Sequence, residues 1–108
     1  MSRTEQREST RYGDMLDLML YRGILIWRNN TGAVRKRGRL VRFGTPGSGD
    51  FLGVLPDGRH IEVEVKTPAG RLSDAQRRHQ REVVRRHGVY ITAVTTEELA
   101  SKLREVMG

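Results

Sequence analysis

Hydrophobic residues recur along this chain at two spacings, one typical of helices and one typical of strands. Leucines and methionines between 15 and 20 follow the helical spacing, so a helix is expected over about 4–22, and Gly23 stands where it should stop. The next apolar residues, 24–27, are continuous and few, which predicts a short buried strand. The N-terminal part of the chain is therefore expected to be a helix followed by a strand.

Two further apolar runs flank the sequence Pro56-Asp57-Gly58 and predict a β-hairpin. Proline suits the second position of a type I turn, and glycine suits the left-handed residue that closes a three-residue loop. With this loop, counting back along the two strands places Asp50 opposite Glu64. Cross-strand partners project to the same side of a sheet, so the two carboxylates are expected to converge.

The C-terminal half predicts a second helix, a strand and a third helix. Ser73 starts the helix and Gly88 ends it, the β-rich run 89–94 follows, and a capping threonine opens a last helix over about 95–106. The order α-β-β-β-α-β-α describes a single α/β domain over residues 1–108, with a small mixed β-sheet flanked by helices.

Asp50, Glu64 and Lys66 form the candidate catalytic group. Side chains alternate along a strand, so Glu64 and Lys66 share a face about 7 Å apart, and Asp50 joins them there. Two carboxylates can hold Mg²⁺, and a lysine beside them can stabilise charge on a reacting phosphate. The alternative is a set of solvated cross-strand ion pairs, in which Glu62 could take part.

Several motifs occur in a recognisable order: Gly-Ser-Gly-Asp at 47–50, Glu-Val-Lys at 64–66, and Gly-Arg-Leu-Ser-Asp-Ala-Gln at 70–76. Segments 27–32 and 42–47 fit the same pattern. Together they resemble the VRR-NUC nucleases, a branch of the PD-(D/E)XK superfamily that includes stand-alone phage proteins and domains of larger repair enzymes. The similarity extends over nearly the whole chain. It implies the restriction-endonuclease-like fold and a DNA endonuclease that uses Mg²⁺ or Mn²⁺, with no small-molecule cofactor.

The resemblance also implies roles for individual residues. Asp50 and Glu64 would bind the metal ion, and Lys66 would support the attacking water. Relatives often have proline before the aspartate, whereas this chain has Gly49, which is expected to loosen the start of the strand.

Two more family positions can be placed on the chain. A helical glutamate that joins the metal shell corresponds to Glu8, with Glu5 as a rival and a solvated helix-start glutamate as the alternative. A glutamine near the active site corresponds to Gln76. This glutamine could equally close a capping box with Ser73, and the two roles are compatible.

The chain carries 20 Lys and Arg against 13 Asp and Glu, a net charge of +7, which indicates a polyanionic partner. The stretch 35–42 is expected to be a mobile or ribbon-like phosphate clamp, the alternative being a solvated surface. Arginines also recur every four residues along the second helix. The predicted DNA contacts are Arg28, Arg35, Lys36, Arg37, Arg39, Arg42, Arg71 and Arg77.

Three aromatic or imidazole residues have simpler interpretations. Trp27 continues an apolar run, which favours the core over a base-stacking position. His79 and His87 lie on the second helix with no acid identifiable as a partner, so packing or surface positions are expected for them.

Other features limit the possible functions. The absence of cysteine fits a reducing cytosol, and no apolar run has the length of a membrane span. A homodimer cutting branched DNA, such as a four-way junction, is expected, with the first helix (Met15, Leu18, Met19, Leu20) as a candidate interface and core packing as the alternative. A catalytically silent basic module that binds nucleic acid, or a structural protein assembling through its helices, would be the alternatives to a nuclease.

Overall fold

The computed structural model describes residues 3–30 and 32–108, apart from the side chains of 3–9 and 43. Its elements are α1 (Arg3–Tyr21), β1 (Leu25–Arg28), β2 (Gly32–Lys36), β3 (Arg39–Phe43), β4 (Phe51–Val54), β5 (His60–Val65), α2 (Asp74–Arg85), β6 (Val89–Ala93) and α3 (Thr96–Met107). Among the helices in these ranges, none combines the length and the hydrophobicity needed to cross a membrane.

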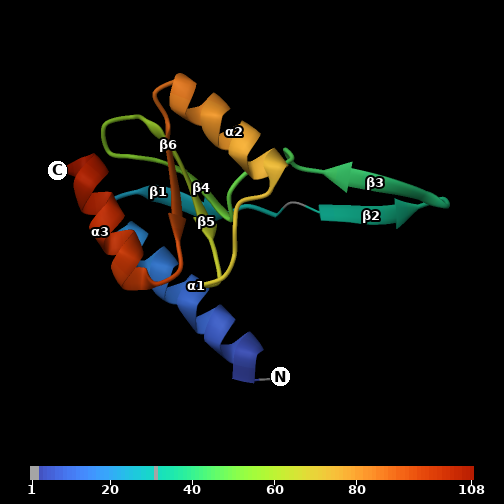
Figure 1. Ribbon diagram of the computed structural model, residues 1–108, viewed down its shortest axis with the longest axis horizontal. Coiled ribbons are helices and arrows are strands. Elements are labelled where there is room, and N and C mark those ends of the chain that lie inside the picture. Colours follow the sequence, from blue (N-terminus) through green and yellow to red (C-terminus); the bar gives the residue numbers. More distant parts are fainter. Residues whose placement is uncertain (1–2, 31) are drawn as a thin grey trace.

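Four strands form the central sheet, in the order β1-β4-β5-β6. The first three are antiparallel, and β6 runs parallel to β5 after the crossover through α2. Helix α2 covers one face of the sheet, whereas α1 and α3 lie together on the other (Figure 1). The predicted α/β architecture with a mixed sheet and three helices is therefore confirmed.

The hydrophobic core lies between the sheet and the α1–α3 layer. Alternate residues of β5, Ile61, Val63 and Val65, point into it, and Met15 and Met19 of α1 are fully buried there. Met15 and Met19 therefore belong to the core, which was the alternative to their forming a dimer interface. The intervening residues of β5 face α2 and carry the polar groups described below.

The β4–β5 hairpin has the predicted register. Leu55 donates its N–H to the carbonyl of Arg59 at 2.8 Å, and Gly58, with φ +94°, donates to the carbonyl of Leu55 at 2.8 Å. Phe51 pairs with Val63, so the preceding residue, Asp50, lies opposite Glu64. The turn sequence is sufficient to set which side chains meet across this hairpin.

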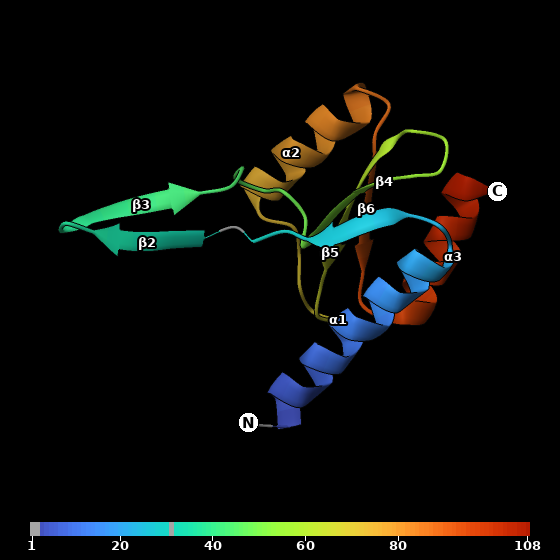
Figure 2. The ribbon, with the colours of Figure 1, turned by 180° about the vertical axis from the view of Figure 1, so that it is seen from behind.

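Strands β2 and β3 form a separate two-stranded ribbon that projects from the body of the protein (Figures 1 and 2). Its two-residue loop has both Arg37 (φ 52°) and Gly38 (φ 77°) in the left-handed region, as a type I′ turn requires. Of the two forms expected for 35–42, the ribbon is the one observed. The predicted element order is wrong in omitting these two strands.

Candidate active site

Asp50 and Glu64 face each other at the end of the hairpin, on the α2 side of the sheet. The Oδ2 atom of Asp50 accepts the N–H of Val65 at 2.7 Å, which holds the carboxylate against β5. The backbone of Asp50 is held from the other side, because its carbonyl accepts the N–H of Asn29 at 2.9 Å. The predicted meeting of the two carboxylates follows from this pairing.

Glu64 is only 7% exposed, and its environment disfavours ionisation. Burial, and next the negative charge of Asp50, raise the pKa of Glu64 to about 7, although the ammonium of Lys66 and the amide of Gln76 act in the opposite direction. Two carboxylates that repel each other in a partly desolvated place form a site that a cation would stabilise.

Gln76, in the first turn of α2, connects the members of the site. Its Nε2 donates to Oε1 of Glu64 and its Oε1 accepts from Nζ of Lys66, each at 2.8 Å. The same Oε1 also accepts the backbone N–H of Ser73, which completes the predicted capping box. Gln76 therefore has both of the contacts expected for it, and Nζ of Lys66 lies 3.6 Å from Glu64.

Tyr12 of α1 is a neighbour of this site that the sequence did not indicate. Burial, followed by the charge of Asp50, raises the pKa of its hydroxyl. The guanidinium of Arg28, a predicted DNA contact, lies 4.2 Å from the centre of the Tyr12 ring and 5.0 Å from that of Phe51. Helical spacing alone could not show that the charge of Asp50 acts on the Tyr12 hydroxyl.

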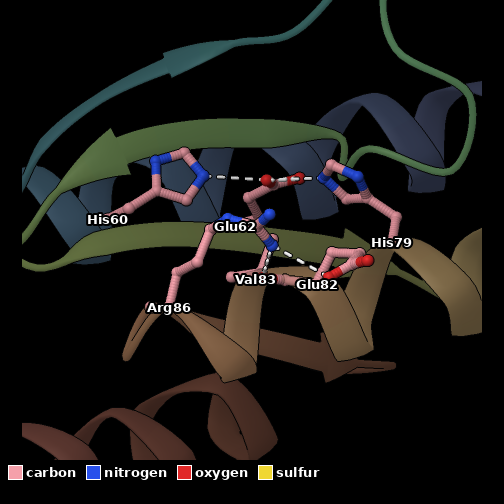
Figure 3. Close-up of a pocket in the computed structure, with 7 residues that line it drawn as sticks. His60, Glu62, His79, Glu82, Val83 and Arg86 are labelled. Atoms are coloured by element: carbon pink, nitrogen blue, oxygen red, sulfur yellow. Dashed lines mark hydrogen bonds and ion pairs between the residues drawn. The ribbon is translucent and has the colours of Figure 1, made fainter.

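Glu62 is not the solvated ion-pair residue considered from the sequence. It is 3% exposed, and its Oε2 lies 2.8 Å from Nε2 of both His60 and His79 (Figure 3). The expectation that His79 lacks an acidic partner is therefore wrong, because the partner comes from β5. The three side chains line a cavity of about 460 Å³ beside α2.

The second oxygen of Glu62 holds the segment that leads to Asp50. Oε1 accepts the N–H of Gly49 at 2.8 Å, and a Cβ atom at position 49 would lie 2.9 Å from the carbonyl oxygen of Val63. Burial alone would raise the pKa of Glu62, but the hydrogen bonds from Gly49 and the two histidines leave it below its usual value. Gly49 was expected to loosen this segment. Instead it makes a buried hydrogen bond that proline could not donate.

Replacing Glu62 with methionine is expected to lower the free energy of unfolding by about 3 kcal/mol, because Gly49 and two imidazoles lose their shared acceptor. Urea denaturation monitored by circular dichroism measures this loss. Glu62→Gln should retain more of the stability, since its amide can still accept the N–H of Gly49.

Glu82 offers a matched control on the rim of the same cavity. Its side chain is 51% exposed and pairs with the exposed arginines Arg85 and Arg86. Glu82→Met should therefore change the free energy of unfolding by less than about 0.5 kcal/mol. Equal effects at positions 62 and 82 would show that the buried network adds no stability.

The donor set of Asp50 and Glu64 fits a hard divalent cation, which prefers carboxylate oxygens. Among the side chains that the structure describes, no cluster of three or more acidic, histidine or cysteine residues forms a metal site. The third predicted acid, Glu8, belongs to α1, but its side chain and that of its rival Glu5 lie outside the described part. Of the three predicted metal ligands, Asp50 and Glu64 are therefore the two whose side chains the structure describes.

Basic side chains are exposed on the ribbon and near the start of α2. The predicted contacts on the ribbon are all exposed: Arg35, Lys36, Arg37, Arg39 and Arg42. Arg71 and Arg77 are also exposed near the start of α2, where Arg77 pairs with Asp74 and donates to the carbonyl of Leu72 at 3.0 Å. The cationic ribbon and the N-terminal end of α2 lie beside the segment that carries Asp50 (Figure 2).

Comparisons with known proteins found no matching family model, no matching curated protein and no matching solved structure. The chemistry of the site is therefore inferred from its own residues. The resemblance to VRR-NUC nucleases rests on the sequence motifs, and no comparison adds to it.

Proposed function

We propose that this protein is a metal-dependent DNA endonuclease of the VRR-NUC type within the PD-(D/E)XK superfamily. The observation that carries the proposal is the convergence of Asp50, Glu64 and Lys66: the hairpin register places Asp50 opposite Glu64, and the amide of Gln76 joins Glu64 to Lys66. A basic module that only binds nucleic acid would not require two mutually repelling carboxylates beside an ordered ammonium group.

Asp50 and Glu64 would hold Mg²⁺ or Mn²⁺ through their carboxylate oxygens. When bound, such an ion lowers the pKa of water and neutralises charge on a phosphate. The Val65 N–H fixes the orientation of Asp50, and the amide of Gln76 fixes that of Glu64. The protein thereby contributes a pre-organised pair of ligands on a rigid hairpin.

Lys66 would act on the reacting phosphate. Its ammonium group is kept next to Glu64 by Oε1 of Gln76 at 2.8 Å, and its side chain is only 18% exposed. A positive charge in a partly desolvated place stabilises the charge that develops during phosphodiester hydrolysis more strongly than one in water. Lys66 can also orient the attacking water through a hydrogen bond.

The substrate would be DNA bound along the basic ribbon and the start of α2. We further propose that the active species is a homodimer that cuts branched DNA, such as a four-way junction, in the cytosol of a host cell. One site makes one nick, and a two-fold dimer presents two identical sites to a two-fold substrate.

The test is to incubate the protein with end-labelled single-stranded, duplex, flap and four-way-junction DNA, in Mg²⁺, Mn²⁺ or EDTA. Cleavage that needs the metal ion supports the nuclease. Binding without cleavage under every metal condition would instead favour the silent DNA-binding module. Equal cutting of linear duplex and junction would refute the preference for branched DNA.

The ribbon is expected to carry much of the salt dependence of DNA binding. Each phosphate contact that is lost should reduce the slope of log affinity against log salt by about one. The triple variant Arg35→Gln, Lys36→Gln and Arg39→Gln keeps the turn residue Arg37 in place. Its slope, measured by fluorescence anisotropy, should fall by about two to three for every DNA sequence.

Arg104 provides the control, because it is exposed on α3, on the other side of the sheet from α2. Arg104→Gln should leave the slope within experimental error of the original. If the triple variant also keeps the original slope, the ribbon is a solvated surface and makes no phosphate contacts.

A further inference from the structure

Half of the sheet face that carries the active site is open. Trp27 pairs with Leu52, which pairs with Glu62, and Glu62 contacts His79 of α2, so all these side chains lie on the α2 face. Helix α2 packs mainly against the β6 edge, whereas Leu25 and Trp27 of β1 are exposed. Trp27 is 48% exposed here, and the expectation that it belongs to the core is wrong.

The exposed indole is part of a small apolar shelf. Leu25 and Val54 are cross-strand partners on the same face, and Leu25 is 66% exposed. Leu52 and Val54 are half-buried. We define this shelf as Leu25, Trp27, Leu52 and Val54.

The shelf adjoins the candidate active site. Leu52 lies two residues after Asp50 on the same face, a separation of roughly 7 Å along a strand. Asn29, two residues after Trp27, donates its backbone N–H to the carbonyl of Asp50 at 2.9 Å. Trp27 is therefore diagonal to Asp50, on the neighbouring strand and one same-face step along it, and Glu64 lies one strand further. The strand that carries it leads directly to the basic ribbon.

We propose that the shelf binds an unpaired nucleobase of the DNA strand held in the active site, with Trp27 as its stacking platform. This inference rests on the proposed nuclease function and adds a subsite to it. The ribbon would hold phosphates while the uncharged shelf takes the adjoining base. Stacking on an aromatic side chain contributes roughly tenfold to a hundredfold in affinity per base and needs no particular sequence.

The chemistry of the shelf favours a base over a second copy of the chain. A stable protein interface buries about 800 Å² on each partner, far more than four side chains of this kind provide. The exposed basic side chains of the adjoining ribbon also oppose the pairing of two copies through this particular surface. Bases inside a duplex have no free face, so this subsite selects single-stranded or branched DNA.

Trp27 is the single tryptophan of the chain, so its fluorescence reports on the shelf alone. The experiment titrates the wild-type protein with a 12-nucleotide oligothymidylate in EDTA and follows tryptophan emission, with anisotropy of a labelled oligonucleotide as the measure of binding. Quenching that saturates together with the anisotropy is expected. A 12-base-pair duplex should bind with little quenching.

Two variants give a second readout. Trp27→Ala should weaken binding of the oligothymidylate about tenfold while duplex binding changes less than twofold, and Trp27→Phe should restore most of the loss. If Trp27→Ala fails to fold, the presence or absence of saturable quenching in the wild-type protein still decides the question.

The outcomes separate this inference from the nuclease itself. Quenching without any metal-dependent cleavage would support the shelf and refute the proposed enzyme. Oligonucleotide binding with unchanged emission would overturn the shelf even if the protein cleaves DNA. An emission change that depends on protein concentration without DNA would also overturn it, because a second copy would then cover Trp27.

Discussion

Replacing Lys66 with alanine is expected to abolish DNA cleavage, lowering the single-turnover rate at least about a hundredfold, while DNA affinity changes less than twofold. The ammonium group lies 2.8 Å from Gln76 and 3.6 Å from Glu64, inside the group of residues proposed to act on the phosphate. The arginines of the ribbon, which the variant retains, supply most of the charge that binds DNA. Cleavage of a labelled junction in Mn²⁺ and anisotropy in EDTA measure the two effects separately.

Lys102 gives a matched control. Its ammonium group is also hydrogen-bonded, to the carbonyl of Thr92 at 2.6 Å, but it belongs to α3 and has no contact with the hairpin carboxylates. Lys102→Ala should therefore cleave at nearly the original rate. If Lys66→Ala cleaves DNA at the wild-type rate, this lysine has no part in the mechanism and the proposed active site is wrong.

The hairpin could be predicted from the sequence because its register depends on only three turn residues. Once Pro56-Asp57-Gly58 sets the loop, every cross-strand pair follows, including that of Asp50 with Glu64. The capping box of Gln76 was also predictable, because it is a local contact within one helical turn. The contact of the same amide with Lys66 required only that α2 start near the end of β5.

The position of Trp27 could not be predicted in the same way. An apolar strand in a sequence indicates burial, but it does not show how much of each sheet face a helix covers. Helix α2 is 12 residues long and covers the β6 edge, so Trp27 stays exposed while its neighbour Ile26 is buried. The pairing of Glu62 with His79 escaped prediction for a related reason, since it joins two elements at a distance of 17 residues along the chain.

The ribbon gave a signal that was too weak to define its strands. Basic residues occupy many positions of the ribbon. The hairpin pattern is therefore reduced to two valines, at 34 and 41, and the Arg37-Gly38 pair between them. Arginine is uncommon in the left-handed region, so the two-residue turn lacks its usual Asn-Gly or Asp-Gly sequence. The basic residues of this stretch obscured the alternation of apolar and polar positions that identifies strands, so two strands were missed.

Replacing Glu64 with glutamine is expected to stabilise the metal-free protein at pH 8 by up to about 3 kcal/mol, although it should remove metal-dependent cleavage. The pKa of Glu64 is about 7 in the folded protein and close to 4.5 when the chain is unfolded. Between these values the folded state holds a proton that the unfolded state has lost. The protein therefore loses stability as the pH rises from 4.5 through 7, and ionised Glu64 destabilises it above that range.

Glutamine has nearly the same shape and carries no charge at any of these pH values, so the gain should appear at pH 8 and vanish near pH 4.5. Urea denaturation in EDTA at both pH values measures it, and Glu82→Gln, at an exposed glutamate whose pKa is lowered by the side chain of Arg86, should show no such gain. Calorimetric titration with Mn²⁺ should show that Glu64→Gln has lost the heat of metal binding. If the gain in stability were the same at both pH values, it would come from packing, and neither burial nor the charge of Asp50 would raise the pKa of Glu64 in the folded protein.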